Sequence, residues 1–252
     1  MKTIKYLAIA LLAAATASCA DESPTQLGKV EVTAKAIAVL PENALIEFEV
    51  PKGSLVDELG QVTLFAADGS ESSTWTMRIS ESKFAAAVGE LNPSTTYQLR
   101  INSMDINLNG DGYGDDEYSN YIVPNFTVTT SKPNDYSALG YDTKYGDIGS
   151  HYVNLTLSYN SFVDSYSDFG GLYLSTTPNF EDAVRWHDYW VDRPELTISD
   201  LKPATTYYYF IYMDRIRLFY HGTDEYNYGE VATDFYNVII APQNNKFTTA
   251  AE

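Results

Sequence analysis

The chain of 252 residues is 44% hydrophobic and 14% aromatic, a composition that can bury real cores and excludes intrinsic disorder. Its 34 acidic residues outnumber 16 basic ones, and the net charge of −18 repels nucleic acid and anionic lipid, which excludes a nucleic-acid partner. The single cysteine rules out an intrachain disulfide and a cysteine-based zinc site.

The N-terminus has the pattern of a bacterial lipoprotein leader. Lys2 and Lys5 precede an apolar run over residues 6–15, which has signal-peptide length and is too short to span a bilayer. The run ends in Thr-Ala-Ser before Cys19, which resembles the lipobox of bacterial lipoproteins. The resemblance implies a signal peptide over residues 1–18 and a lipid on Cys19. A cut after Ala17, which would give a simply secreted protein, is the alternative.

The residues after Cys19 favour a tether at the cell surface. The acidic pair Asp21-Glu22 resembles the surface-export signal of lipoproteins in Bacteroides-like bacteria. By that resemblance the protein is lipid-anchored in the outer membrane and faces the cell exterior. Residues 19–28 contain Ser, Pro, Gln and Gly and are predicted to form the tether.

A repeat divides the remainder of the chain into two domains. The stretch Asn92-Pro-Ser-Thr-Thr-Tyr97 has a near copy in Lys202-Pro-Ala-Thr-Thr-Tyr207, 110 residues further on. Each copy follows a leucine and leads into an alternating strand, and the pattern breaks at residues 131–135. We therefore predict one domain over residues 29–131 and a second over residues 136–252.

Both domains show short segments with period-two alternation and no convincing amphipathic helix, which predicts antiparallel β-sandwiches. A turn is expected at residues 67–70, and residues 231–240 are expected to form an extra strand or the early part of the last one. In the first domain we expect strands at 30–39, 44–50, 62–65, 74–79, 83–88, 98–104 and 126–130. In the second we expect strands at 151–159, 195–201 and 208–213, and a further strand with its turn within residues 168–180.

The repeated Leu-x-Pro-x-Thr-x-Tyr pattern resembles the corner between the fifth and sixth strands of fibronectin type III domains. The resemblance implies an all-β protein made of two tandem immunoglobulin-like (fibronectin type III-like) antiparallel β-sandwiches. It also implies that Tyr97 and Tyr207 are scaffold, with hydroxyls that cap the preceding backbone. The stretch from Gly170 to Pro178 resembles the third strand and turn of fibronectin-like domains in Bacteroides-type surface proteins.

An acidic loop between the last two strands of the first domain is a candidate calcium site. Oxygen-bearing side chains alternate there around Gly110 and Gly112, as in EF-hand-like and thrombospondin-type calcium loops. Calcium would order the loop with modest affinity, and the alternative is a solvated loop that binds no ion. The candidate ligands are Asp105, Asn107, Asn109, Asp111, Asp115 and Asp116.

Two stretches in the second domain contain more aromatic residues than a scaffold requires. Flat aromatic rings beside polar groups suit sugar rings or a protein partner. In the alternative, alternate side chains face the core instead. We expect Trp75 in the first domain to lie in the core or cover a strand edge, rather than to serve as a sugar platform. The candidate ligand-binding residues are Trp186, His187, Tyr189, Trp190, Tyr220, Tyr226 and Tyr228.

The sequence favours a non-catalytic function. It contains no Gly-x-Ser-x-Gly, no P-loop, no His-Glu-x-x-His and no cysteine placed as a nucleophile. The leading hypothesis is a surface-anchored binding or adhesion lipoprotein that presents two sandwiches to a glycan or protein partner. The alternative hypothesis is a passive structural spacer or subunit of a larger cell-envelope assembly.

Overall fold

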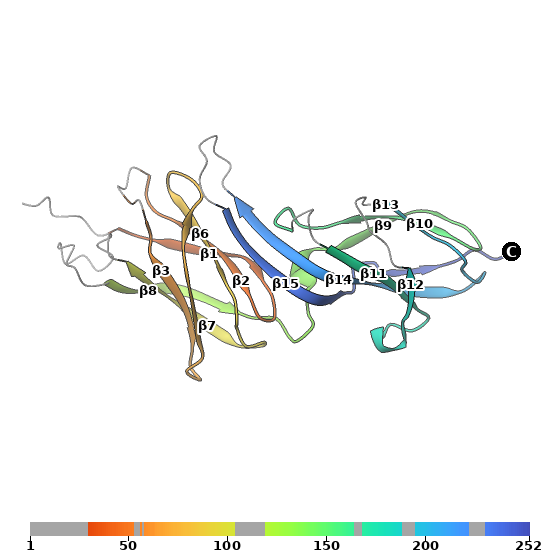
Figure 1. Cartoon of the computed structure of the whole chain (residues 1–252), viewed down its shortest axis with the longest axis horizontal. Helices are drawn as coiled ribbons and strands as arrows, with labels where there is room; N and C mark the ends of the chain where they lie inside the picture. Colours follow the sequence, from red (N-terminus) through yellow and green to blue (C-terminus); the bar gives the residue numbers. More distant parts are fainter. Residues whose placement is uncertain are drawn as a thin grey trace, which may run out of the picture.

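The chain folds into antiparallel β-strands arranged as two successive sandwiches, as a computed structural model shows (Figure 1). The structure describes residues 30–52, 56, 58–103, 119–163, 168–187, 195–221 and 230–252. The leader over residues 1–18 and the tether over 19–28 lie outside the described residues and stay predictions.

The first sandwich consists of two four-stranded sheets, ordered β1-β2-β6-β5 and β4-β3-β7-β8. Its apolar core lies between them and includes Ile46, Phe48, Leu64, Phe84 and Leu99, each at most 1% exposed. The strands are β1 (Thr33–Val39), β2 (Ala44–Glu49), β3 (Gln61–Ala66), β4 (Glu71–Trp75), β5 (Met77–Arg78), β6 (Lys83–Val88), β7 (Thr96–Ser103) and β8 (Ser119–Thr129).

The second sandwich pairs a three-stranded sheet, β13-β10-β9, with a sheet ordered β12-β11-β14-β15, and β16 also pairs with β14. Its core includes Leu139, Val153, Tyr209, Ile211 and Ile216, which are all fully buried. The elements are η1 (Ser137–Leu139), β9 (Asp142–Ile148), β10 (Val153–Ser158), β11 (Asp168–Ser175), η2 (Phe180–Asp182), β12 (Val184–His187), β13 (Glu195–Ile198), β14 (Thr206–His221), β15 (Glu230–Ile240) and β16 (Lys246–Thr248). The predicted fold class of two tandem immunoglobulin-like antiparallel sandwiches is confirmed.

Two predicted segments differ from the structure. The strand expected at residues 74–79 is split at Thr76, where the chain leaves the sheet of β4 and enters the sheet of β5. The strand expected at residues 208–213 is much longer, because β14 continues to His221 and pairs along β15, which includes the residues 231–240 expected to form an extra strand or the early part of the last one. The result is a long hairpin. In Figure 1 it runs from the second sandwich toward β1, β2 and β6 of the first.

The hairpin and the first sandwich share a small apolar cluster. Ala38, Leu45, Ile79 and Ala85 lie on the outer face of the β1-β2-β6-β5 sheet, and all four are at most 4% exposed. Val231 on β15 packs against them and is 6% exposed. Outer sheet faces normally contact water, so this burial shows that the hairpin covers this face of the first sandwich.

Candidate functional site

The repeated corner motif has a structural role in both domains. The Tyr97 hydroxyl accepts a hydrogen bond from the Asn92 backbone N–H at 2.8 Å, and the Tyr207 hydroxyl accepts one from Lys202 N–H at 3.0 Å. Tyr97 is 1% exposed and Tyr207 is 9% exposed. The expectation that these tyrosines cap the preceding backbone is confirmed, so neither belongs to a binding site.

Trp186 is the only candidate residue of its stretch whose side chain lies within the described part of the chain. It is half-buried against the core of the second sandwich, and its Nε1–H donates to the Ser199 carbonyl at 3.0 Å. His187 ends β12, opposite Leu172 on β11. Tyr189 and Trp190 lie outside the described residues. Trp186 therefore joins β12 to the end of β13, a packing role that its sequence neighbourhood did not distinguish from a binding role.

Tyr220 makes a contact between the domains. Its hydroxyl donates to the Glu47 carboxylate on β2, and Lys83 Nζ on β6 lies 3.1 Å from the other oxygen of that carboxylate. Burial by itself would raise the pKa of Glu47, but the hydrogen bonds from Tyr220 and Lys83 outweigh it, so this pKa is lowered. Burial and the Glu47 carboxylate raise the pKa of the Tyr220 hydroxyl. Tyr226 and Tyr228 lie outside the described residues.

An aromatic cluster covers the outer face of the sheet formed by β12, β11, β14 and β15. Phe180 on η2 lies over Phe210 and Tyr173, with ring centroids 5.6 Å and 5.3 Å away, and Tyr212 completes the group 6.3 Å from Tyr173. Phe210 is only 4% exposed although its neighbours Tyr209 and Ile211 face the core. The unbroken aromatic and aliphatic run over residues 207–213 of β14 signals a stretch that is covered on both faces.

Of the two places expected for Trp75, the core and a strand edge, the structure shows the strand edge. Trp75 is 54% exposed at the end of edge strand β4. Its register with β3 places it opposite Gln61. Period-two alternation gives the face of a strand on which a side chain lies, but it does not show whether that face is covered.

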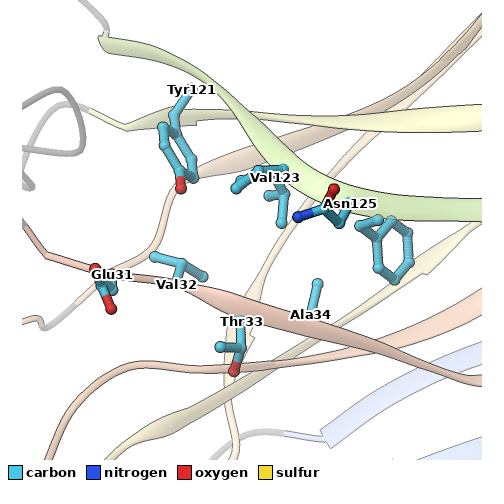
Figure 2. Close-up of a pocket in the computed structure, with 9 residues that line it drawn as sticks. Glu31, Val32, Thr33, Ala34, Tyr121, Val123 and Asn125 are labelled. Carbon is cyan, nitrogen blue, oxygen red and sulfur yellow. The ribbon is translucent and has the colours of Figure 1, made fainter.

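A groove in the first domain lies between β1 and β8, the outermost strands of the two sheets (Figure 2). It has a volume of about 360 Å³. Tyr121 on β8 and Glu31, which precedes β1, stand on opposite sides of it, and Glu31 is its one charged lining residue. Thr33 and Asn125 also line the groove, which marks the open side of the sandwich between the two edge strands.

The calcium hypothesis falls on residues that the structure does not describe. Asp105, Asn107, Asn109, Asp111, Asp115 and Asp116 all lie in the segment 104–118. Within the described ranges, His, Cys, Asp and Glu side chains form no group of three that could hold a metal ion. The same ranges contain no helix long and apolar enough to cross a membrane.

Comparisons with known proteins add a weak structural similarity. No family model matches the chain, and no curated protein matches it. Among solved structures, the crystal structure of the chicken CNTN1 FN1-FN3 domains aligns at 12% identity with a TM-score of 0.25. The alignment covers 88% of this chain and 66% of that chain, slightly less than two thirds of it.

The strand order and the corners define the class of protein independently of that alignment. Each domain has a β-sandwich with a sheet ordered as in the other domain, β4-β3-β7-β8 in the first and β12-β11-β14-β15 in the second. Each has a tyrosine corner that caps the backbone five residues upstream. The protein thus consists of two tandem sandwiches of the fibronectin type III-like kind.

Proposed function

We propose that the protein is a non-catalytic lipoprotein of the outer membrane, anchored through Cys19, which faces the cell exterior and binds a glycan or a protein. The main supporting observation is Trp75, an aromatic side chain that is 54% exposed on a face of the first sandwich. The contact between the domains through Tyr220, Glu47 and the apolar cluster around Leu45 is compatible with this role. A covered sheet face and a partly buried hydrogen bond hold the two sandwiches as one unit. Such a unit presents its remaining faces to a partner in a fixed arrangement, which reduces the entropy lost on binding.

A passive spacer is the second candidate function. It is favoured by the structural roles of Trp186 and Tyr220, because both side chains hydrogen-bond within the chain. A spacer and a binder would share the anchor and the rigid two-domain unit. They differ in whether a solvent-facing surface makes specific contacts with a partner.

The anchor is tested by cell fractionation. Wild-type chain and a Cys19→Ala variant are expressed in a bacterium of the Bacteroides type, and surface exposure is measured by protease treatment of intact cells. Wild-type protein should sediment with the outer membrane and be digested, whereas the variant should be released. Retention of the Cys19→Ala variant in the membrane would contradict lipid anchoring through this residue.

The choice between binder and spacer is tested with the same cells. Wild-type cells should adhere to surfaces coated with glycans or with host or matrix proteins, and cells lacking the protein should adhere less. Equal adhesion on every surface, together with envelope defects in the cells that lack the protein, would support the spacer.

A further inference from the structure

One row of side chains crosses all four strands on the outer face of the β4-β3-β7-β8 sheet. Trp75 on β4 lies opposite Gln61 on β3, Gln61 lies opposite Asn102 on β7, and Asn102 lies opposite Asn120 on β8. We call these four residues the amide row. Neighbouring strands are about 4.8 Å apart, so the row extends over about 14 Å.

The amide row faces away from the core. Val62 and Ile101, the neighbours of Gln61 and Asn102 in sequence, are both 0% exposed and belong to the core of the first domain. Successive residues of a strand point to opposite faces, so Gln61 and Asn102 point outward. Trp75 is itself 54% exposed, and the directly paired Asn120 shares the face.

The backbone beneath Trp75 is firmly held. Thr76 is 6% exposed, and its N–H and its hydroxyl both donate to the Gly60 carbonyl, at 3.0 Å and 2.9 Å. The chain passes from one sheet to the other at Thr76. The Trp75 indole therefore lies at the edge of the outer face, next to a backbone that these hydrogen bonds hold in place. Side chains displayed by strands hold a binding geometry better than side chains on loops.

The face is electrically neutral, although the chain as a whole has a net charge of −18. The amide row contains three amides and an indole and no charged group. In the same sheet, Arg100 is neutralised by Glu71 at 3.5 Å and lies over the Phe65 ring, 5.5 Å from its centroid. A face of this kind offers no local charge to pair with a charged partner, and it favours a neutral polar one.

One amide of the row also has unused hydrogen-bonding capacity. Asn102 Oδ1 is buried and has no hydrogen-bond partner among the described residues. A buried acceptor of this kind is costly, and a rotation of the Asn102 side chain would bring it within reach of a donor that a ligand supplies. Each primary amide offers two donor hydrogens and one acceptor oxygen, which suits the mixed donor and acceptor character of a hydroxyl group.

We propose that the amide row is a binding site for a neutral oligosaccharide. The inference rests on the proposed binding function and names its ligand class and its site. The Trp75 indole stacks on the apolar face of one sugar ring, while Gln61, Asn102 and Asn120 hydrogen-bond the hydroxyls of the rings that follow. The length of the row suits a short oligosaccharide better than a single sugar.

The test measures binding of defined neutral sugars to the full chain by titration calorimetry. The chain is purified from membranes in a detergent without a sugar headgroup, and cello-, xylo-, manno- and maltohexaose serve as probes. Trp75→Ala removes the stacking surface, and Gln61→Met removes one amide at nearly constant size. Tyr236→Ala is the matched control, because Tyr236 is 63% exposed on β15 of the second domain. Thermal melting shows whether each variant is folded.

At least one hexasaccharide should bind. Trp75→Ala should raise its Kd at least tenfold, equivalent to about 1.4 kcal/mol of binding free energy, while Tyr236→Ala leaves it unchanged. Gln61→Met should give a smaller increase of the same sign. A hexasaccharide that binds wild type and Trp75→Ala equally well would overturn the site but leave the proposed binding function standing.

Two further outcomes would overturn the ligand class. If no hexasaccharide binds but wild-type cells still adhere to protein-coated surfaces, the partner is a protein and the carbohydrate inference fails. If Trp75→Ala abolishes that adhesion in the absence of sugar binding, the amide row is a protein contact. Absence of both sugar binding and adhesion would overturn this inference and the proposed binding function together.

Discussion

Replacing Tyr220 with Phe removes one hydroxyl from the contact between the two domains and should weaken it measurably. The hydroxyl donates to the Glu47 carboxylate, whose side chain is 15% exposed, so water can replace the lost donor only in part. A hydrogen bond to a charged group contributes about 1.5–3 kcal/mol, and Tyr220→Phe should lower the free energy of unfolding by about that amount at pH 7. Lys83 remains as the second partner of the carboxylate.

The effect of Tyr220→Phe should depend on pH in a defined direction. The pKa of Glu47 is lowered in the folded chain from its ordinary value of 4.5, because the hydrogen bonds from Tyr220 and Lys83 outweigh the opposing effect of burial. A lowered carboxyl pKa stabilises the fold fully above the unfolded value and loses this contribution as the pH falls through the folded value. The difference between wild type and Tyr220→Phe should therefore shrink below about pH 4.5.

The assay is urea unfolding of the full chain at pH 7 and at pH 3.5, followed by fluorescence and circular dichroism. Glu47→Gln and the double variant complete a cycle that separates this contact from the other carboxylates of the chain. Tyr236→Phe is the control, because this exposed hydroxyl lies on β15 of the same hairpin. A Tyr220→Phe variant within about 0.5 kcal/mol of wild type at pH 7 would refute the role assigned to the hydroxyl.

Three further predictions concern the corners, the apolar cluster and the acidic loop. Tyr97→Phe and Tyr207→Phe should each lower the stability of the domain that contains the substitution by about 1 kcal/mol in urea unfolding, because each removes the partly buried hydrogen bond to the corner backbone. Equal stability would contradict the capping role. Ala85→Glu should lower the free energy of unfolding by at least about 3 kcal/mol, because it places a charge beneath the hairpin, where Ala85 is 0% exposed. Small-angle scattering should show a more extended molecule, and unchanged scattering would contradict the packing. Calcium should bind the segment that contains Asp105 and Asp111 at about 10⁻⁴–10⁻³ M, and calorimetry without calcium heat at millimolar concentration would end that hypothesis.

The local sequence pattern predicts most of the fold, but it does not predict how the two domains are arranged. The corner motif and the alternation before and after it predict two sandwiches, because each corner depends only on nearby residues. The sheet switch at Thr76 is absent from that pattern, since period-two alternation continues on either side of it. The covered face did leave a signal. Leu45 and Ala85 are apolar at positions that alternation assigns to the outside, as expected for a face that another element covers.

The candidate binding site could not be predicted from the sequence, because it depends on the register between strands. The amide row joins residues of four strands, and its members meet only through the register between those strands. A one-residue slip in any pair would move that side chain to the core face, so the row cannot be recognised before the register is known. The aromatic-rich stretches were more conspicuous in sequence, yet their described members Trp186 and Tyr220 hydrogen-bond within the chain. Density of aromatic residues alone does not distinguish packing from binding in a sandwich whose core itself contains tyrosines.

The two outer faces of the first domain differ in a way that relates domain packing to binding. The face of the β1-β2-β6-β5 sheet is apolar around Leu45 and Ala85, and the β14–β15 hairpin covers it. The opposite face displays Trp75 among amides. Covering the first face removes the apolar surface that would otherwise favour non-specific association. The hairpin contact also fixes the direction in which the second face points relative to the second domain. The contact at Tyr220 and the amide row thus have complementary roles, since one sets the orientation of a surface and the other gives that surface its chemistry.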